Sequence, residues 1–289
     1  MAGKVAICGM STYIGKALAE ELRRNYIDTV GISSSDTQQP APDLARKLDG
    51  CIAVCNLTGE PKLTKWTSRS QYDIFSSRIM SVRSVVEAVR YCKNRPSVVI
   101  CLSNALVYDQ YEVHDDFSTQ YGNTFMAEVG QIETKEALKL KRYTPEIRII
   151  VARTGYIMSQ RGGIFPLLRK LCRIGFGGII GDGYQCLPMV HIDDAAQALL
   201  MLATNTKCEG IYNITIPQIA SMRELCDGLR RRMGRHQLSV PKSIVSILAG
   251  RASTLVEQNC KVQPQRLHMS GYHFQYPDVE EILKELTGK

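Results

Sequence analysis

Residues 4–15 read KVAICGMSTYIG, and this stretch decides the fold. The apolar run at residues 4–8 predicts a short buried strand, and Gly9 follows it as a turn signal. From residue 13 to residue 25, apolar side chains recur at helical spacing. A strand, a glycine turn and a helix in this order are typical of the unit that opens a dinucleotide-binding α/β domain.

The same alternation of strands and helices continues over the first 150 residues. Further strands are predicted at residues 29–33, 51–55, 97–102 and 148–152, and helices at residues 70–93 and 125–141. Nearly every residue of 97–102 is apolar, which is typical of a parallel strand covered by helices on both faces. We therefore predict an α/β fold: a Rossmann-type doubly wound parallel sheet with a smaller C-terminal α/β lobe.

The second half of the chain carries more glycine-rich turns, at residues 162–163, 177–178, 181 and 183. Shorter helices are predicted there, at residues 193–203, 222–233 and 279–286, and Pro241 could open another. We expect residues 1–215 to form the NAD(P)-binding domain, with lobe insertions after about residue 155. Residues 216–289 are expected to form the C-terminal part of the lobe.

The composition is that of an ordinary globular protein, with 44% hydrophobic and 22% charged residues among 289. The net charge is +8, and its densest cationic group is Arg230, Arg231, Arg232 and Arg235, where a helix should end. No aromatic residues interleave with this group, so we expect a solvated helix end and no nucleic-acid partner.

Ten cysteines are spread along the chain without a Cys-x-x-Cys pair, and most lie in apolar runs. We expect reduced, buried thiols, with neither a disulfide framework nor a metal site. No apolar stretch reaches the roughly 18 residues of a membrane span, and the first residues carry no signal-peptide pattern. These observations predict a cytoplasmic protein without a membrane partner.

The turn at residues 9–15 has glycine at its first and last positions, with Thr12 between them. Glycine allows the tight bend and lets the backbone approach a pyrophosphate at the positive end of the helix. The Thr12 side chain could crowd that phosphate or hydrogen-bond it. The alternative interpretation is a helix that Ser11 caps and that binds nothing.

The end of the second predicted strand decides which nicotinamide cofactor fits. A carboxylate there would select the ribose hydroxyls of NAD, and an arginine would select the phosphate of NADP. The residues present are Ser33, Ser34, Ser35 and Asp36. Asp36 could be a ribose ligand or a loop residue, so both NADP and NAD remain open.

Several segments follow the order and spacing of one known family. They are residues 56–61 (NLTGEP), Trp66, Ser77-Arg78, residues 153–155 (RTG), 161–163 (RGG), 177–185 (GGIIGDGYQ), 190–194 (VHIDD) and 262–267 (VQPQRL), Gly271-Tyr272 and Tyr276-Pro277. Together they resemble the epimerase-like atypical branch of the extended short-chain dehydrogenases/reductases. This is the YfcH-type group, whose members are often labelled nucleoside-diphosphate-sugar epimerases.

The resemblance implies a bound NADP(H) or NAD(H) at the carboxyl ends of the strands. The family's nucleotide contacts would fall on Gly9, Ser11, Thr12, Tyr13, Ile14, Gly15, Ser33, Ser34, Leu57, Thr58, Gly59 and Glu60. Close relatives usually have glycine at the position of Thr12 and arginine at that of Ser34, and both departures weaken the inference of tight NADP binding. A monomer and a homodimer are both compatible with the sequence.

The usual catalytic pair of short-chain dehydrogenases is missing, because no tyrosine has a lysine four residues later. What remains after the fourth predicted strand is Ser103, where these folds often keep a hydroxyl facing the nicotinamide, and Tyr108. Tyr108 could donate a proton or simply pack on a loop. Glu128 could serve as an acid or base, or be a solvated helix residue.

Two further residues are candidates for substrate contact. Arg153 ends a strand on the cleft side and could hold an anionic group, with an ion pair as the alternative. His191 could contact a ligand or be structural, and Asp193 is expected to cap the next helix. The sequence thus predicts an epimerase or oxidoreductase acting on a sugar-like or small anionic substrate. The alternative is a non-catalytic cofactor-binding regulatory or scaffolding protein on the same fold.

Overall fold

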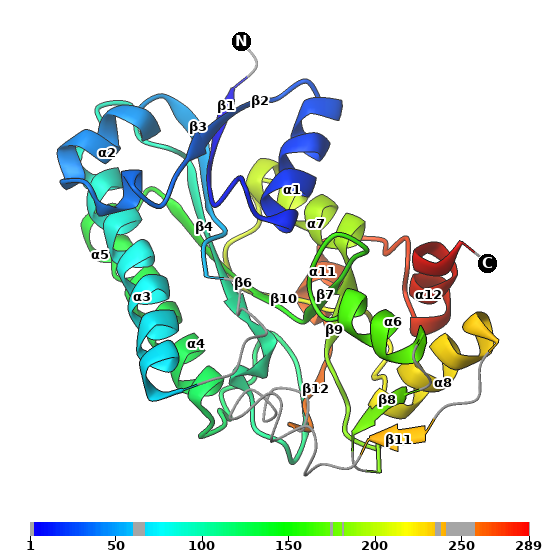
Figure 1. Ribbon diagram of the computed structural model, residues 1–289. Coiled ribbons are helices and arrows are strands. Elements are labelled where there is room, and N and C mark those ends of the chain that lie inside the picture. The colour runs from blue at the N-terminus through cyan, green and yellow to red at the C-terminus, as the bar shows by residue number, and fades with distance from the viewer. Residues whose placement is uncertain are drawn as a thin grey trace.

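Six parallel strands form the central sheet of the computed structural model, which describes residues 3–59, 67–173, 176–180, 182–234, 238–240 and 258–288 (Figure 1). Their order is β10-β6-β4-β3-β1-β2. The strands are β1 (Lys4–Cys8), β2 (Asp28–Ile32), β3 (Cys51–Asn56), β4 (Val98–Asn104), β6 (Arg148–Thr154) and β10 (Gly210–Ile214). The prediction of a Rossmann-type doubly wound parallel sheet is confirmed.

Helices cover both faces of this sheet (Figure 1). One face packs on α1 (Tyr13–Arg24) and α7 (Ile192–Thr204), and the other on α2 (Ala41–Leu48), α3 (Ser68–Tyr91), α4 (Phe125–Leu138) and α5 (Leu140–Tyr143). Alternate residues of a strand point to opposite faces. Val5 and Ile7 therefore join the core under α1, whereas Ala6 and Cys8 join the core under α3.

The strand order places a topological switch point beside β1. From β1 the chain winds through α1 to β2 on one side, and through α2 it then returns to β3 on the other. The carboxyl ends of β1 and β3 thus flank a crevice from which the connecting loops diverge. Ligands of open α/β sheets bind in such a crevice.

A third core cluster underlies the second lobe, which lies beside α1 and α7 in Figure 1. It is built from β7 (Tyr156–Met158), β9 (Met189–His191), α6 (Phe165–Arg173), β8 (Phe176–Ile180), α8 (Met222–Met233) and α12 (Val279–Thr287). A strand β11 (Leu238–Val240) pairs with β8. Segments on both sides of residue 215 therefore share this core.

The remaining described elements are short. They are β5 (Val113–His114), β12 (Lys261–Val262), α11 (Gln265–Met269) and two 3-10 turns, Asp36–Gln38 and Ala105–Val107. Within the ranges described, no helix is both long enough and apolar enough to cross a bilayer.

Several predicted elements differ from those observed. The helix expected at residues 125–141 is divided into α4 and α5, and Gly177-Gly178 lie in β8 rather than in a turn. Neither α2 nor β10 was predicted. The proposed helix at Pro241 and the cation Arg235 lie outside the described residues.

Candidate functional site

The turn between β1 and α1 depends on its two glycines. Gly9 has φ +82°, a conformation that favours glycine, and a Cβ on it would lie 3.2 Å from the carbonyl carbon of Leu57. A Cβ on Gly15 would lie 2.2 Å from the Gly9 carbonyl oxygen. No larger side chain fits at either position without moving the backbone, so this tight turn requires glycine at both ends.

Thr12 occupies the middle of the turn without strain. Its backbone is extended, with φ −69° and ψ 162°. The Thr12 hydroxyl donates to the Gly9 carbonyl at 2.8 Å and accepts from the Gly15 N–H at 3.0 Å, so Thr12 is the N-cap of α1. The cap is therefore Thr12 and not Ser11. Because its hydroxyl bonds within the turn, Thr12 is accommodated at the position where the family resemblance led us to expect glycine.

Two donors remain at this helix start. The N–H groups of Ser11 and Ile14 have no acceptor in the described part of the chain. Free N–H groups at a helix N-terminus, together with the helix dipole, favour an anion such as a pyrophosphate. The turn thus fits a dinucleotide.

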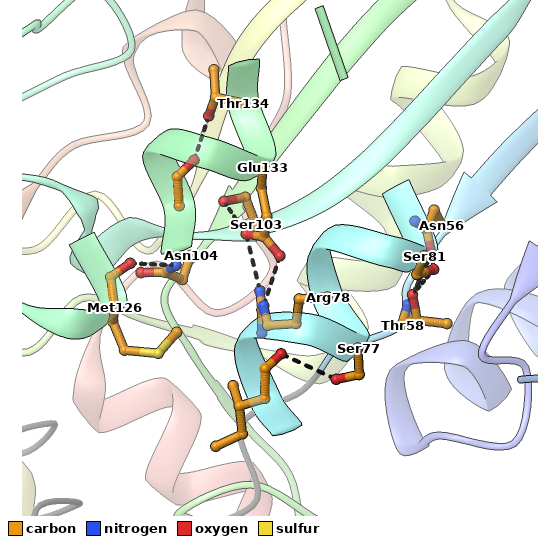
Figure 2. Close-up of polar contacts among 12 residues, drawn as sticks. Asn56, Thr58, Ser77, Arg78, Ser81, Ser103, Asn104, Met126, Glu133 and Thr134 are labelled. Carbon is orange, nitrogen blue, oxygen red and sulfur yellow. Dashed lines mark hydrogen bonds and ion pairs between the residues drawn. The ribbon is translucent and has the colours of Figure 1, made fainter. Parts of the chain in front are cut away.

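The loop after β3 closes the other side of the crevice. The Leu57 N–H donates to the Cys8 carbonyl at 3.0 Å, which holds this loop against the end of β1. The Thr58 hydroxyl donates to Asn56 Oδ1 at 2.5 Å and also contacts the Ser81 hydroxyl on α3 (Figure 2). Gly59 has φ +101°, and the expected contact Glu60 lies outside the described residues.

The end of β2 presents hydroxyl groups and no free carboxylate. Asp36 Oδ2 accepts from the Ser33 N–H at 2.8 Å and from the Ser33 hydroxyl at 2.7 Å, and Oδ1 accepts from Lys47 Nζ at 2.7 Å. The hydrogen bond from Lys47, followed by those from Ser33, lowers the pKa of Asp36 to about 2. Both carboxylate oxygens are thus engaged, whereas Ser34 is exposed.

A cavity of about 80 Å³ adjoins this crevice at the carboxyl ends of β4 and β6. Its walls are largely apolar, from residues that include Ile14, Leu102, Leu106, Met126, Ile157 and Ile164. Its polar lining includes Arg78, Ser103, Asn104 and Thr154, and two phenols, Tyr13 and Tyr156, also line it. Burial raises the pKa of Tyr156, so this phenol is neutral.

A buried ion pair between Arg78 and Glu133 holds Ser103, a residue of the cavity lining (Figure 2). The Ser103 hydroxyl donates to Glu133 Oε2 at 2.8 Å. Arg78 Nε lies 2.6 Å from Glu133 Oε1, and Arg78 Nη2 lies 3.3 Å from Oε2. The side chains of Arg78 and Glu133 are only 3% and 1% exposed. Strand β4 and helices α3 and α4 thus each contribute one member of a fixed polar chain.

Asn104 adds an unusual acceptor to the same wall. Its Nδ2 donates to the Met126 carbonyl at 3.2 Å, while its buried Oδ1 receives no hydrogen bond in the ranges described.

Three residues of this site were not predicted from the sequence: Asn104, Glu133 and Tyr156. Arg78 was noted there only as part of a motif. Glu133 carried no signal, because its partner lies 55 residues away along the chain.

Tyr108 and Arg153 lie outside the cavity lining. Both side chains are fully buried, and Arg153 Nη1 donates to the Tyr108 hydroxyl at 2.9 Å. The Tyr108 hydroxyl donates in turn to Asn213 Oδ1 at 2.9 Å. Arg153 also contacts the Tyr121 hydroxyl, so it meets two phenols where an anionic group or an ion pair was expected. The buried hydrogen bonds of Tyr108 and Arg153 favour a structural role over those of proton donor and substrate ligand.

His191 is the N-cap of α7, and Asp193 is not. The His191 Nδ1 accepts from the Asp193 N–H at 3.3 Å, and Nε2 lies 2.9 Å from Glu285 Oε2. The ring contacts that of Tyr276 at an interplanar angle of 50°, with centroids 4.0 Å apart. His191 borders a separate polar groove between α1, α7 and α12 rather than the cavity at Ser103. Glu128 is exposed on α4 and does not line that cavity either.

Comparison with known proteins agrees with this geometry. The model of the NAD dependent epimerase/dehydratase family matches residues 5–215, and that of a domain of unknown function (DUF1731) matches residues 240–286. The Arabidopsis thaliana "Epimerase family protein SDR39U1 homolog, chloroplastic" is 28% identical over 98% of this chain and 86% of its own length. "Epimerase family protein YfhF" of Bacillus subtilis is 28% identical over 97% of each chain.

Solved structures share the whole fold. Human epimerase family protein SDR39U1 (isoform 2), crystallised with NADPH, superimposes with a TM-score of 0.89 at 22% identity and covers 99% of each chain. A Thermus thermophilus UDP-glucose 4-epimerase in complex with NAD gives a TM-score of 0.75 at 14% identity, covering 98% of this chain and 97% of its own. The resemblance predicted from the motifs is confirmed, and the chain belongs to the NAD-dependent epimerase/dehydratase family.

Proposed function

We propose that this protein binds NADP(H) or NAD(H) at the crevice between β1 and β3 and uses it for hydride transfer to or from a small substrate in the adjoining cavity. The observation that carries the proposal is the juxtaposition of two sites. A helix start with unused N–H donors at Ser11 and Ile14 lies beside a cavity that Tyr13 and Ile14 share with Ser103. Such an arrangement places a bound cofactor next to a protected reaction space.

The residues that would hold the cofactor follow from this geometry. Gly9, Ser11, Ile14 and Gly15 form the pyrophosphate turn, and Thr58 and Gly59 form the facing loop. The bound cofactor would supply the hydride acceptor or donor. Ser103, fixed by Glu133, would be the polar group that orients the substrate.

A second function is a cofactor-binding protein without catalysis. The observation in its favour is that no lysine appears in the described lining of the cavity, whereas the usual catalytic pair of this fold class joins a phenol to a lysine ammonium group. Tight cofactor binding with no hydride exchange for any substrate offered would favour this alternative.

We also propose a reducing compartment for the protein. No disulfide joins any of the ten cysteines, all of which the structure describes, and nine of them are buried. Disulfides are rare in compartments that keep thiols reduced, and ten cysteines without a disulfide fit such a compartment.

The test is a fluorescence titration of the purified protein with NADPH and NADH, alongside two matched variants. Ser11→Glu places a negative charge in the nucleotide turn and should weaken binding about tenfold. Thr206→Glu makes the same charge change on an exposed turn between α7 and β10, at the amino-terminal edge of the sheet, and should leave binding unchanged. Equal affinity in all three proteins, or no binding by the wild type, would overturn the proposal.

A further inference from the structure

The hydrogen bond from Ser103 to Glu133 determines whether the Ser103 hydroxyl can donate to a ligand or only accept from it. A serine hydroxyl carries one hydrogen and two lone pairs, whereas an ionised carboxylate can only accept. The Ser103 hydrogen is committed to Glu133 Oε2 at 2.8 Å. Ser103 can therefore offer a ligand only its lone pairs, as a hydrogen-bond acceptor.

The ion pair with Arg78 keeps Glu133 as the acceptor and Ser103 as the donor of this hydrogen bond. Arg78 binds both oxygens of Glu133, and both side chains are almost completely shielded from water. A buried carboxylate without its cation would be costly, and in the ion pair with Arg78 both Glu133 oxygens act as acceptors. The packing around the pair is close: a Cβ on Gly59 would lie 2.4 Å from Arg78 Cγ.

Asn104, the next residue of β4, also presents a hydrogen-bond acceptor. Its Nδ2 is committed to the Met126 carbonyl, which leaves Oδ1 as an acceptor without a donor in the described part of the chain. A buried, unsatisfied acceptor is unfavourable and is relieved when a ligand supplies a hydrogen. Ser103 and Asn104 thus present two neighbouring acceptor oxygens, Oγ and Oδ1, in the cavity lining.

The charge of the cavity also limits the ligand. Arg78 is the only cation in the described lining, and Glu133 neutralises it at 2.6 Å. The remaining walls are mostly apolar. An anionic group would find no free countercharge there, whereas an uncharged hydroxyl can donate to the acceptor oxygens of Ser103 and Asn104.

We propose that this cavity selects small uncharged alcohols, whose hydroxyl donates to Ser103 Oγ, over carbonyl compounds and carboxylates of the same size. Glu133 is then a positioning residue, because it sets the direction of the Ser103 hydrogen bond without touching the ligand. The preference for alcohols does not depend on the cofactor. Only the further step, in which the bound alcohol is the substrate of a hydride transfer, rests on the function proposed above.

The test compares cyclopentanol with cyclopentanone, which share one apolar ring and differ in whether the oxygen can donate. Dissociation constants are measured by NMR titration of the cofactor-free protein. The wild type should bind the alcohol about fivefold more tightly than the ketone. Ser103→Ala leaves the ion pair in place and should lower this ratio toward unity, with Asn104 Oδ1 as the acceptor that remains.

Glu133→Gln provides the sharper variant, because a glutamine amide can donate to Ser103 and turn the hydroxyl hydrogen toward the cavity. The alcohol-to-ketone preference should then fall to unity or reverse. Glu136→Gln is the matched control: Glu136 also joins α4 to α3, through Arg83 at 3.0 Å, but it accepts its hydrogen bonds from Arg83 and Lys139 and not from Ser103. It should keep the wild-type ratio.

The outcomes separate the two proposals. A wild-type protein that binds the ketone as well as or better than the alcohol, or a Ser103→Ala variant that keeps the alcohol preference, overturns the inference about polarity. Because no cofactor is present in the titration, these results leave the cofactor proposal untouched. If Glu133→Gln fails to fold, the Ser103→Ala comparison still decides.

Discussion

The ring of Tyr13 lies where Gly162 has no side chain: a Cβ on Gly162 would lie 2.3 Å from Cδ1 of Tyr13. Tyr13 is the first residue of α1, beside the nucleotide turn, whereas Gly162 belongs to the loop between β7 and α6. The second lobe is therefore packed directly on the start of the nucleotide-binding helix. This contact gives the Arg161-Gly162-Gly163 segment a physical reason for its glycines.

Gly162→Ala should disturb this contact. The added methyl group must displace the Tyr13 ring, and such overpacking typically lowers the free energy of unfolding by about 1–3 kcal/mol. Because Tyr13 opens α1, we also expect NADPH binding to weaken about tenfold. Urea denaturation and a fluorescence titration measure the two effects. In a Tyr13→Ala background the same substitution should cost little, and an undiminished cost there would refute the explanation.

Tyr108→Phe should act on stability rather than on the site. Removing the hydroxyl leaves Arg153 Nη1 and Asn213 Oδ1 without this partner in a buried region, at a cost of about 1–3 kcal/mol in unfolding free energy. Burial also raises the pKa of Tyr108 to about 12, which makes it a poor proton donor at neutral pH. NADPH affinity should be unchanged. Tyr121→Phe, which loses only a 3.4 Å contact with Arg153, is the milder control.

The sheet was predictable because its strands are nearly uniform apolar runs, such as residues 97–102. Strand β10 escaped prediction because a buried Asn213 stands between Tyr212 and Ile214 and interrupts the apolar pattern of the strand. Helix α2 has only eight residues, too few for its three buried positions to establish a period. The domain boundary at residue 215 remains a prediction.

The candidate site was predictable only where backbone geometry dominates. Gly9 and Gly15 are read directly from the turn that they permit. The pairing of Arg78 with Glu133 depends on how α3 and α4 pack, which no local pattern encodes. Tyr108 follows β4, as the sequence predicted. The 3-10 turn Ala105–Val107 points its ring into the protein, and no sequence pattern indicates whether a side chain after such a turn is buried or faces the cavity.

Ser34→Arg should shift the cofactor preference toward NADP(H). Ser34 is exposed at the end of β2, and the nearby Asp36 carboxylate is fully occupied by Ser33 and Lys47. A guanidinium there could bind a ribose phosphate without a competing free carboxylate. We expect the ratio of NADPH to NADH affinity to rise about tenfold in parallel titrations. Thr206→Arg, at the opposite edge of the sheet, should leave the ratio unchanged.

Asp36→Asn should remove a pH-dependent part of the stability. The pKa of Asp36 is about 2 in the folded chain, chiefly because of Lys47, against about 3.9 in an unfolded chain. The charged form is therefore favoured by folding. Its contribution is fully present above about pH 4 and is lost as the pH falls toward 2. In urea denaturation, wild type should exceed Asp36→Asn in unfolding free energy near pH 6, and the difference should narrow as the pH falls below about 4. A difference that stays constant over this range would mean that Asp36 contributes by packing and not through its charge.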